Sequence, residues 1–373
     1  MSTSIGQYGA SAASLVLAAG VQELTNAQTT LAWQTSSQGI VAQTYAGLGT
    51  SRSSVFNLTP KITQVQAWQT NITNAQNSLT VTATALKQIV SLAQTMAANL
   101  LGISGTSESS TVSTVATEAS STLDQIATAL NTSTGAGYVF AGQTSTEAPV
   151  RDPSSVSSGS LSTSIASMLK TNMEKGASGT DILSAATTAM NSDNTVFSSN
   201  ISDATDATAS LTKANHQHTS TITGSSTIST YGIVATQSST SDVSSTSTGS
   251  PIPSTGSPIK DLMRDMMLIS GMSGLSSSST GYTDLVNQLH TSLVNTTNQL
   301  INMETTVGAQ QNALTARATM LTNTTTALTT QLENARTTDI AQVALQTTSV
   351  QTSLKASFML IADMKDMSLA NYL

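Results

Sequence analysis

The sequence has no cysteine, few charged residues and few aromatic residues. The lack of cysteine excludes disulfides, thiol catalysis and cysteine-ligated metals, and it leaves the redox compartment open. Charged residues make up 9% of the 373 residues, compared with about 25% in a typical soluble protein. Because so few charges repel other copies only weakly, the composition favours self-association.

Nucleic-acid binding and membrane insertion are both unexpected. The formal net charge is −7 and Lys and Arg are not clustered, whereas phosphate binding requires basic clusters. No apolar stretch has the length that crosses a bilayer. The short apolar patch at 12–20 is preceded by no basic residue, the first being Arg52. We therefore expect no conventional cleaved signal, and any export would use another route.

Two rows of apolar residues repeat at every seventh position and predict two long helices. Each row covers about 43 residues, or roughly 65 Å of helix at about 1.5 Å per residue. The first row is Leu58, Val65, Ile72, Leu79, Leu86, Ala93 and Leu100. The second row is Val286, Leu293, Leu300, Val307, Leu314, Leu321 and Leu328. Two such rods, joined through a Ser/Thr-rich middle, can lie antiparallel and bury their rows on each other.

The positions between these rows are only partly apolar. They include Gln69 and Gln76 in the first helix, and Gln310 and Arg317 in the second. Buried amides lower stability unless they are hydrogen-bonded. This half-polar side therefore either completes an ordinary intramolecular bundle or meets other copies of the chain, and the pattern leaves both interpretations open.

Both ends of the sequence have apolar residues at helical spacing and little charge. We call these residues the terminal core; they are Leu17, Val21, Leu24, Leu31, Ile340, Val343, Val350, Leu354 and Ile361. Chain ends fray unless something binds them, and an isolated monomer offers these faces no obvious partner. We therefore expect the terminal core to be buried between subunits.

The part between the two rows contains shorter elements. A helix is predicted over 112–130, and residues 138–150 predict a β-hairpin. The hairpin residues that we single out are Tyr138, Phe140, Gly142 and Pro149. Further on, Thr221 to Thr236 predicts strand, and Ser257-Pro258 opens a short helix with Pro at its first position.

The predicted fold is mainly α, with long antiparallel coiled-coil rods built from both chain ends, a small β-hairpin and a Ser/Thr-rich α+β outer domain. The predicted segments are an N-terminal helical core segment (1–50), the N-terminal half of a rod domain (51–150), a variable outer domain (151–280), the C-terminal half of the rod domain (281–335) and a C-terminal helical core segment (336–373).

Motifs of catalysis and metal binding are weak. Ser167 and Lys170 match S-x-x-K, but the Lys-Thr-Gly element of penicillin-binding enzymes is missing, and chance explains the match better in a chain so rich in Ser. His216 and His218 have no further ligand at a suitable spacing. We expect no enzyme activity, no catalytic residues, no cofactor and no bound metal, although an enzyme within 151–280 is an alternative class.

Three features resemble the flagellin family of bacterial flagellar axial proteins. The first is the plan of helical ends, paired rods and a variable middle. The second is the sequence 138–144 followed by 148–150, which is similar to the hairpin of the inner rod domain, especially in hook–filament junction proteins. The third is the run 332–341 with the ending 368–373, which looks like the family's terminal helix. Flagellins usually carry a charged segment after the first helix, whereas residues 36–49 are uncharged here.

This resemblance implies a self-assembling subunit of the flagellar filament that serves motility, or alternatively a hook–filament junction protein. It implies export through the flagellar type III apparatus to the extracellular flagellum, with help from an export chaperone and a cap, and contacts with other axial proteins. It also implies that the terminal helices are disordered in the monomer and fold on polymerisation. A remote alternative is a coiled-coil adhesin or stalk protein.

Overall fold

The computed structural model describes residues 5–42, 44–239 and 252–366. It is mainly helical, with 70% helix and 5% strand, which confirms the predicted class. Contacts divide the chain into two compact units, which are described separately. The terminal unit comprises Met1–Gln66 and Thr322–Leu373, and the central unit comprises Ala67–Leu321.

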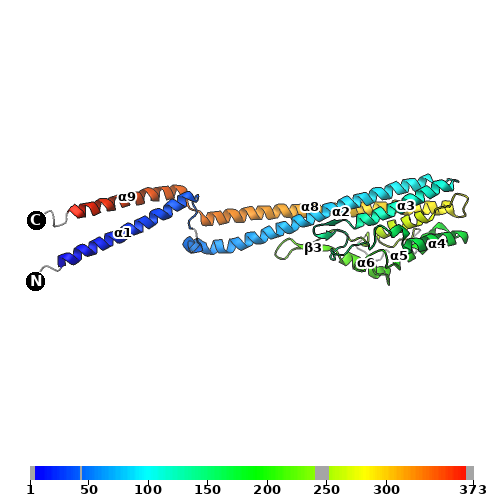
Figure 1. Ribbon diagram of the computed structural model, residues 1–373, viewed down its shortest axis with the longest axis horizontal. Helices are drawn as coiled ribbons and strands as arrows, with labels where there is room; N and C mark the ends of the chain where they lie inside the picture. Colours follow the sequence, from blue (N-terminus) through cyan, green and yellow to red (C-terminus); the bar gives the residue numbers. More distant parts are fainter. Residues whose placement is uncertain (1–4, 43, 240–251, 367–373) are drawn as a thin grey trace. The chain divides into compact units, whose positions relative to one another are not determined.

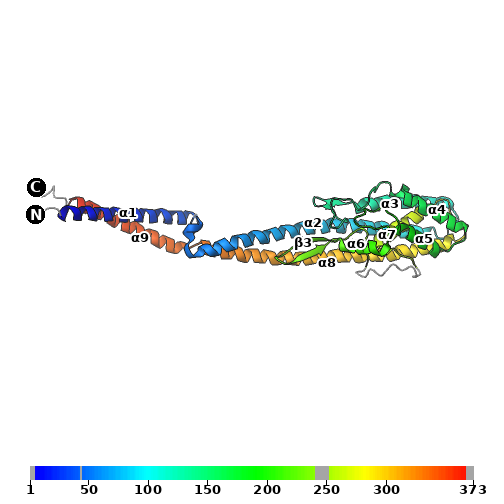
Figure 2. The ribbon, with the colours of Figure 1, turned by 90° about the horizontal axis from the view of Figure 1, so that it is seen from below.

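Two helices from opposite ends of the sequence pack together in the terminal unit. Helix α1 (Ile5–Ser36) and helix α9 (Ile340–Asp366) lie side by side and antiparallel (Figures 1 and 2). Backbone hydrogen bonds link the segment that follows α1 to the segment that precedes α9. Val41 N donates to Arg336 O at 2.7 Å, and Thr338 N donates to Gly39 O at 2.8 Å. Gly39 has φ +86°, and a Cβ there would lie 2.8 Å from Thr338 O, so this close approach requires glycine.

The two predicted long helices are confirmed as α2 (Arg52–Gly102) and α8 (Tyr282–Arg336). A 3₁₀ helix, η1 (Tyr45–Ser51), precedes α2. Within the central unit α2 and α8 run antiparallel. Gln76 Nε2 donates to Thr315 Oγ1 at 3.0 Å, and the Tyr282 hydroxyl, near the other end, donates to Ile103 O at 2.8 Å. Of the two seven-residue rows, Leu58 and Leu328 are half-buried and every other member is buried.

Shorter helices complete the central unit around α7 (Pro258–Gly271), which begins at Pro258 as predicted. The others are α3 (Ser109–Leu130), η2 (Val156–Ser158), α4 (Ser160–Glu174), α5 (Gly179–Asn191) and α6 (Ala207–His216). Helix α7 packs against α3, α4 and α5 (Figure 2). It is buried on nearly every side, including its four charged residues. The division into rod and outer domains stays a prediction.

The described strands form two small antiparallel hairpins. Strands β1 (Ser133–Thr134) and β2 (Gly137–Tyr138) pair with each other, as do β3 (Thr219–Ile222) and β4 (Ile228–Tyr231). The prediction of one strand over 221–236 is therefore wrong. Residues 223–227 form the turn between β3 and β4, and the second strand ends at Tyr231.

The prediction of a hairpin over 138–150 is also wrong, because most of this segment binds distant parts of the chain. Tyr138 N still donates to Ser145 O at 2.8 Å, but Gln143 N donates to Gln217 O at 2.7 Å. Val150 forms its antiparallel bridge with Phe197. Pro149 has no N–H to donate, and its carbonyl accepts from Ser198 N at 2.9 Å. Phe140 is nevertheless fully buried, and Gly142 has φ +66° with its Cα against Gln217 O.

Candidate assembly surface

The outer part of α9 exposes apolar side chains on several sides. Four consecutive residues, Phe358, Met359, Leu360 and Ile361, are exposed by 55%, 69%, 52% and 40%. Successive residues of an α-helix are rotated by about 100°, so four in a row point in directions that surround the axis. A single neighbouring helix can cover only one of these directions. Helix α1 therefore leaves at least two sides of this turn in contact with water.

Helix α1 has a similar exposed turn. Leu15 and Val16 are exposed by 71% and 73%, whereas the next residue, Leu17, is half-buried. The surrounding surface carries very little charge, because Glu23 is the only charged residue in the sequence of α1. Helix α9 likewise has its first charged residue at Lys355. The exposed turn of α1 thus has neutral neighbours, whereas the turn Phe358–Ile361 lies between Lys355 and Asp363.

A groove of about 390 Å³ lies between α1 and α9. It is lined by Ala27, Thr30, Leu31, Gln34, Gln346, Ser349 and Val350. None of these side chains is charged, and several are small. Such a groove can accept an apolar side chain from another molecule without burying an unpaired charge.

The structure divides the terminal-core residues into two groups. Leu31, Val343 and Leu354 are buried in the contact between α1 and α9, and Leu17, Val21, Leu24 and Val350 are half-buried. Ile340 and Ile361 are exposed. One face of α1 and one face of α9 therefore pack against each other within the chain. The apolar side chains outside this contact remain exposed.

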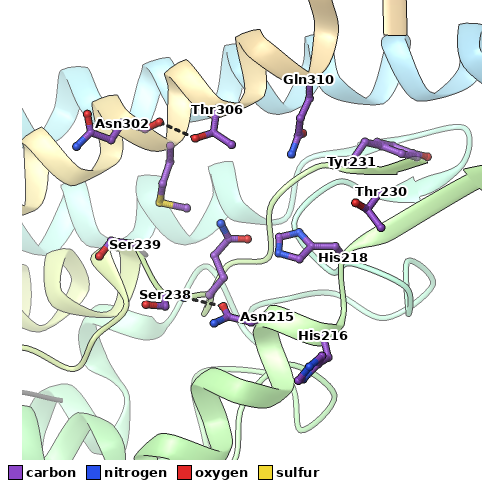
Figure 3. A pocket seen from close by; sticks show the side chains of 12 residues that line it. Asn215, His216, His218, Thr230, Tyr231, Ser238, Ser239, Asn302, Thr306 and Gln310 are labelled. Carbon is purple, nitrogen blue, oxygen red and sulfur yellow. Dashed lines mark hydrogen bonds between the residues drawn. The ribbon is translucent and has the colours of Figure 1, made fainter. Parts of the chain in front are cut away.

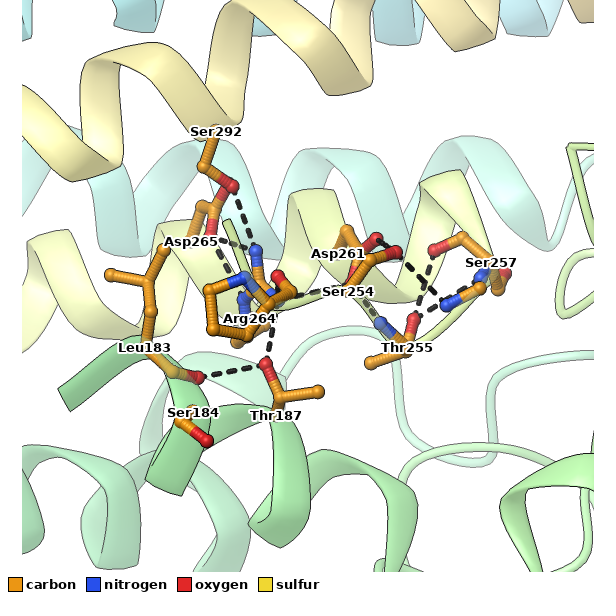
Figure 4. Close-up of polar contacts among 12 residues, drawn as sticks. Leu183, Ser184, Thr187, Ser254, Thr255, Ser257, Asp261, Arg264, Asp265 and Ser292 are labelled. Carbon is orange, nitrogen blue, oxygen red and sulfur yellow. Dashed lines mark hydrogen bonds and ion pairs between the residues drawn. The ribbon is translucent and has the colours of Figure 1, made fainter. Parts of the chain in front are cut away.

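A buried polar cluster on α7 was missed by the sequence analysis (Figure 4). Arg264 is fully buried and donates to Asp265 Oδ1, Asp261 Oδ1, Thr187 Oγ1 and Ser292 Oγ, at distances between 2.7 and 3.1 Å. It also donates to a backbone carbonyl, so each of its nitrogens has a partner. Burial raises the pKa of Asp265 to about 6. The cluster joins α7 to α5 and α8.

The sequence did contain a signal for this cluster. Lys260, Asp261, Arg264 and Asp265 place four charges within six residues of a chain that is otherwise poor in charge. Lys260 is also buried, and its amino group donates to Ser202 Oγ at 3.1 Å. Burial lowers the pKa of Lys260 to about 8, while Asp193 and Asp261 oppose that shift.

The Ser167–Lys170 motif lies on a helix of the central unit. Ser167 and Lys170 are both exposed on α4, and the Ser167 hydroxyl donates to Thr163 O at 2.9 Å. Over the parts of the chain that the structure describes, no group of three His, Asp or Glu side chains is arranged to hold a metal ion.

Comparisons with known proteins assign no family to this chain. No family model matches the chain, and no curated protein matches it either. Among the helices described here, none combines the length and the apolar character that crossing a bilayer requires.

Proposed function

We propose that this chain is a self-assembling structural subunit of the bacterial flagellar filament, in which α1 and α9 form the core of the polymer. The exposed apolar turn Phe358–Ile361 is the observation that supports this most directly. A helix that is apolar on all sides is stable when it is surrounded by other elements. Since α1 covers one side only, the remaining sides need further helices, and other copies of the chain would provide them.

A second copy of the chain is a suitable partner, because each molecule has both an exposed apolar turn and a groove that could accept apolar side chains. Helix α1 presents the exposed side chains of Leu15 and Val16, and the α1–α9 groove is neutral and lined by small residues. A contact between two different faces of identical molecules builds a ring if the rotation closes and a helical filament if it does not, and the filament is the outcome that we propose. Net repulsion between copies is small, because α1 has one charged residue and the two positive and two negative residues of α9 sum to zero.

The finer fold that we propose is a flagellin-like pair of coiled-coil rods, made from α2 and α8, with residues 151–280 as an outer domain. The burial of both seven-residue rows supports the rods, as do the hydrogen bonds that link α2 and α8 in antiparallel register. As in flagellins, export would use the type III apparatus, and assembly would involve a chaperone, a cap and other axial proteins. Burial of the apolar turns on assembly would stabilise the helices.

A hook–filament junction protein is the second candidate. It is favoured by the sequence Tyr138–Gly142 and by the ending Leu369–Leu373, which lies outside the described residues. A junction protein would form a ring or short collar at the end of a hook, whereas a filament subunit would polymerise without limit. The length of the assembly therefore separates the two.

The test is negative-stain electron microscopy of the purified chain, incubated with precipitating salt and seeded with fragments of its own polymer. A filament subunit should give long filaments of uniform diameter. Short oligomers that bind to the ends of purified hooks would instead support the junction protein. A chain that stays monomeric, with seeds and with hooks, would contradict both candidates.

A further inference from the structure

A polar pocket lies in the central unit and uses none of the residues of the assembly proposal. Its volume is about 490 Å³, which falls in the range of about 300–1,000 Å³ that small-molecule sites have. The β3–β4 hairpin, the end of α6 and one face of α8 surround it (Figure 3). Its lining consists mainly of amide and hydroxyl side chains, and none of the described lining residues is Asp, Glu, Lys or Arg.

Three amide side chains in this pocket are held in one orientation by the backbone. Gln237 Oε1 accepts from Val234 N at 2.7 Å, Gln310 Oε1 accepts from Gly232 N at 2.9 Å, and Asn215 Oδ1 accepts from Ser238 N at 3.0 Å. Each oxygen is therefore occupied, and the NH₂ group of each amide is left to donate elsewhere. The Nδ2 group of Asn215 is buried and has no acceptor among the described residues.

His218 adds an acceptor without adding charge. Its Nδ1 lies 3.2 Å from Gly232 O, so Nδ1 carries the hydrogen that is donated to this carbonyl. Burial lowers the pKa of His218, and the ring is therefore neutral at pH 7. In this tautomer Nε2 has a lone pair that can accept a hydrogen bond from a hydroxyl group.

Tyr231 supplies a flat wall to the same pocket. Its ring is half-buried, and its hydroxyl bonds to the side chain of Ser78 on α2. This bond holds the ring in place where it lines the pocket. Figure 3 shows Thr230 and Tyr231 near Gln310 of α8, with Asn302 farther away along the same helix.

We propose that this pocket binds a neutral monosaccharide. The hydroxyl groups of a sugar both donate and accept, so they suit fixed amide donors together with the imidazole acceptor. The C–H face of a sugar ring is apolar and suits the face of Tyr231. A charged ligand fits less well, because the pocket offers it no carboxylate, ammonium or guanidinium partner. This proposal does not depend on the assembly of the chain.

Saturation-transfer-difference NMR on the full chain tests the proposal, with D-glucose and N-acetyl-D-glucosamine as neutral probes and sodium acetate as a charged one. The matched variants are Thr306→Trp, which fills the pocket, and Thr305→Trp, which does not. Both threonines are exposed on α8, and each donates to the carbonyl four residues earlier at 3.0 Å. Only Thr306 lines the pocket.

We expect transfer to at least one sugar in the wild type and in Thr305→Trp, and a loss of at least tenfold in Thr306→Trp. Asn302→Trp, at a second exposed lining position, should give the same loss, so a folding defect of one variant would not decide the result. Equal transfer in Thr306→Trp and Thr305→Trp would place the sugar elsewhere and overturn the proposal. Transfer to acetate alone, or to no probe in the wild type, would overturn it as well.

Discussion

Arg264 and Asp265 are neighbours in the sequence, yet the guanidinium folds back and donates through Nε and Nη2 to one oxygen of the Asp265 carboxylate, at 3.0 and 2.8 Å. Adjacent residues on a helix do not normally face each other. Ser292 of α8 completes the arrangement, because its hydroxyl accepts from Arg264 Nη2 at 2.8 Å and donates to Asp265 Oδ2 at 2.6 Å. The buried ion pair thus depends on a side chain from a different helix.

Replacing Ser292 by Ala should destabilise the central unit. The substitution leaves a buried carboxylate oxygen and a guanidinium hydrogen without partners, which costs about 1–3 kcal/mol. Urea unfolding followed by far-UV circular dichroism measures the change in the free energy of unfolding.

The control for Ser292→Ala is Thr291→Ala. Thr291 is exposed on the same turn, and its hydroxyl bonds only to Asn287 O, at 2.8 Å. A surface change of this kind should stay within about 0.5 kcal/mol of the wild type. If both variants had the same stability, the bridge from α8 would contribute nothing to the cluster.

The buried amino group of Lys260 should make the protein more stable as the pH rises from about 8 to about 10.5. Burial lowers its pKa to about 8 from the usual 10.5. In this interval the unfolded chain binds more protons than the folded one, so the free energy of unfolding increases with pH, by up to about 3 kcal/mol. Urea unfolding at a series of alkaline pH values measures this slope.

In Lys260→Met this alkaline increase should disappear, because the titrating group is gone. Lys170→Met should keep it, since Lys170 is exposed on α4. The groups that face Lys260 are Ser202, Ser210, Phe197, Asp193 and Asp261. The same slope in both variants would show that another group causes it.

Arg317→Met should loosen the β3–β4 hairpin. The guanidinium of Arg317, on α8, donates through Nε and Nη2 to Thr223 O at 3.0 and 2.9 Å, and this carbonyl lies where the chain leaves β3. Removing both bonds frees the turn, so amide hydrogens at 223–228 should exchange at least tenfold faster. Hydrogen exchange followed by mass spectrometry measures this rate.

Arg52→Met is the matched control for the hairpin, because Arg52 is exposed at the start of α2. It should leave exchange in the hairpin unchanged. Unchanged exchange in Arg317→Met as well would mean that the remaining contacts, such as Asn71 Nδ2 to Ile222 O at 3.0 Å, hold the hairpin without Arg317.

The sequence predicted the helices well because their evidence is local. The row from Val65 to Leu100 needs only a fixed spacing to define one helical face, and the structure buries it. The hairpin over 138–150 could not be placed in this way, since Gln143 and Val150 find their partners at Gln217 and Phe197. Such pairing depends on contacts between distant segments, which spacing does not reveal.

The candidate assembly surface was predictable only in part. The spacing showed that both chain ends carry apolar faces, but it could not show which of these faces the two helices use on each other. The structure places Val343 and Leu354 in that contact and leaves Ile340 and Ile361 exposed. The burial of the charged residues of α7 could not be predicted for a similar reason. A buried pair such as Arg264 and Asp265 has the same local sequence as an exposed pair.

Met359→Glu should leave the monomer folded and prevent assembly. Met359 is exposed, so a carboxylate there remains in water and changes monomer stability by no more than about 0.5 kcal/mol. In the proposed polymer the same position is surrounded by other helices, and a carboxylate buried there would lose its hydration, at a cost of several kcal/mol even beside Lys355 one turn earlier. Sedimentation of the seeded sample, with electron microscopy of the pellet, measures the fraction that polymerises.

Gln351→Glu is the matched control, because it adds the same charge to an exposed polar position of α9. Here a carboxylate replaces an amide of equal size, and no exposed apolar turn is interrupted. We expect this variant to polymerise far better than Met359→Glu, with both monomers equally helical by circular dichroism. If Met359→Glu polymerised like the wild type, the turn Phe358–Ile361 would lie outside any contact between subunits, and a filament core built from α9 would be wrong.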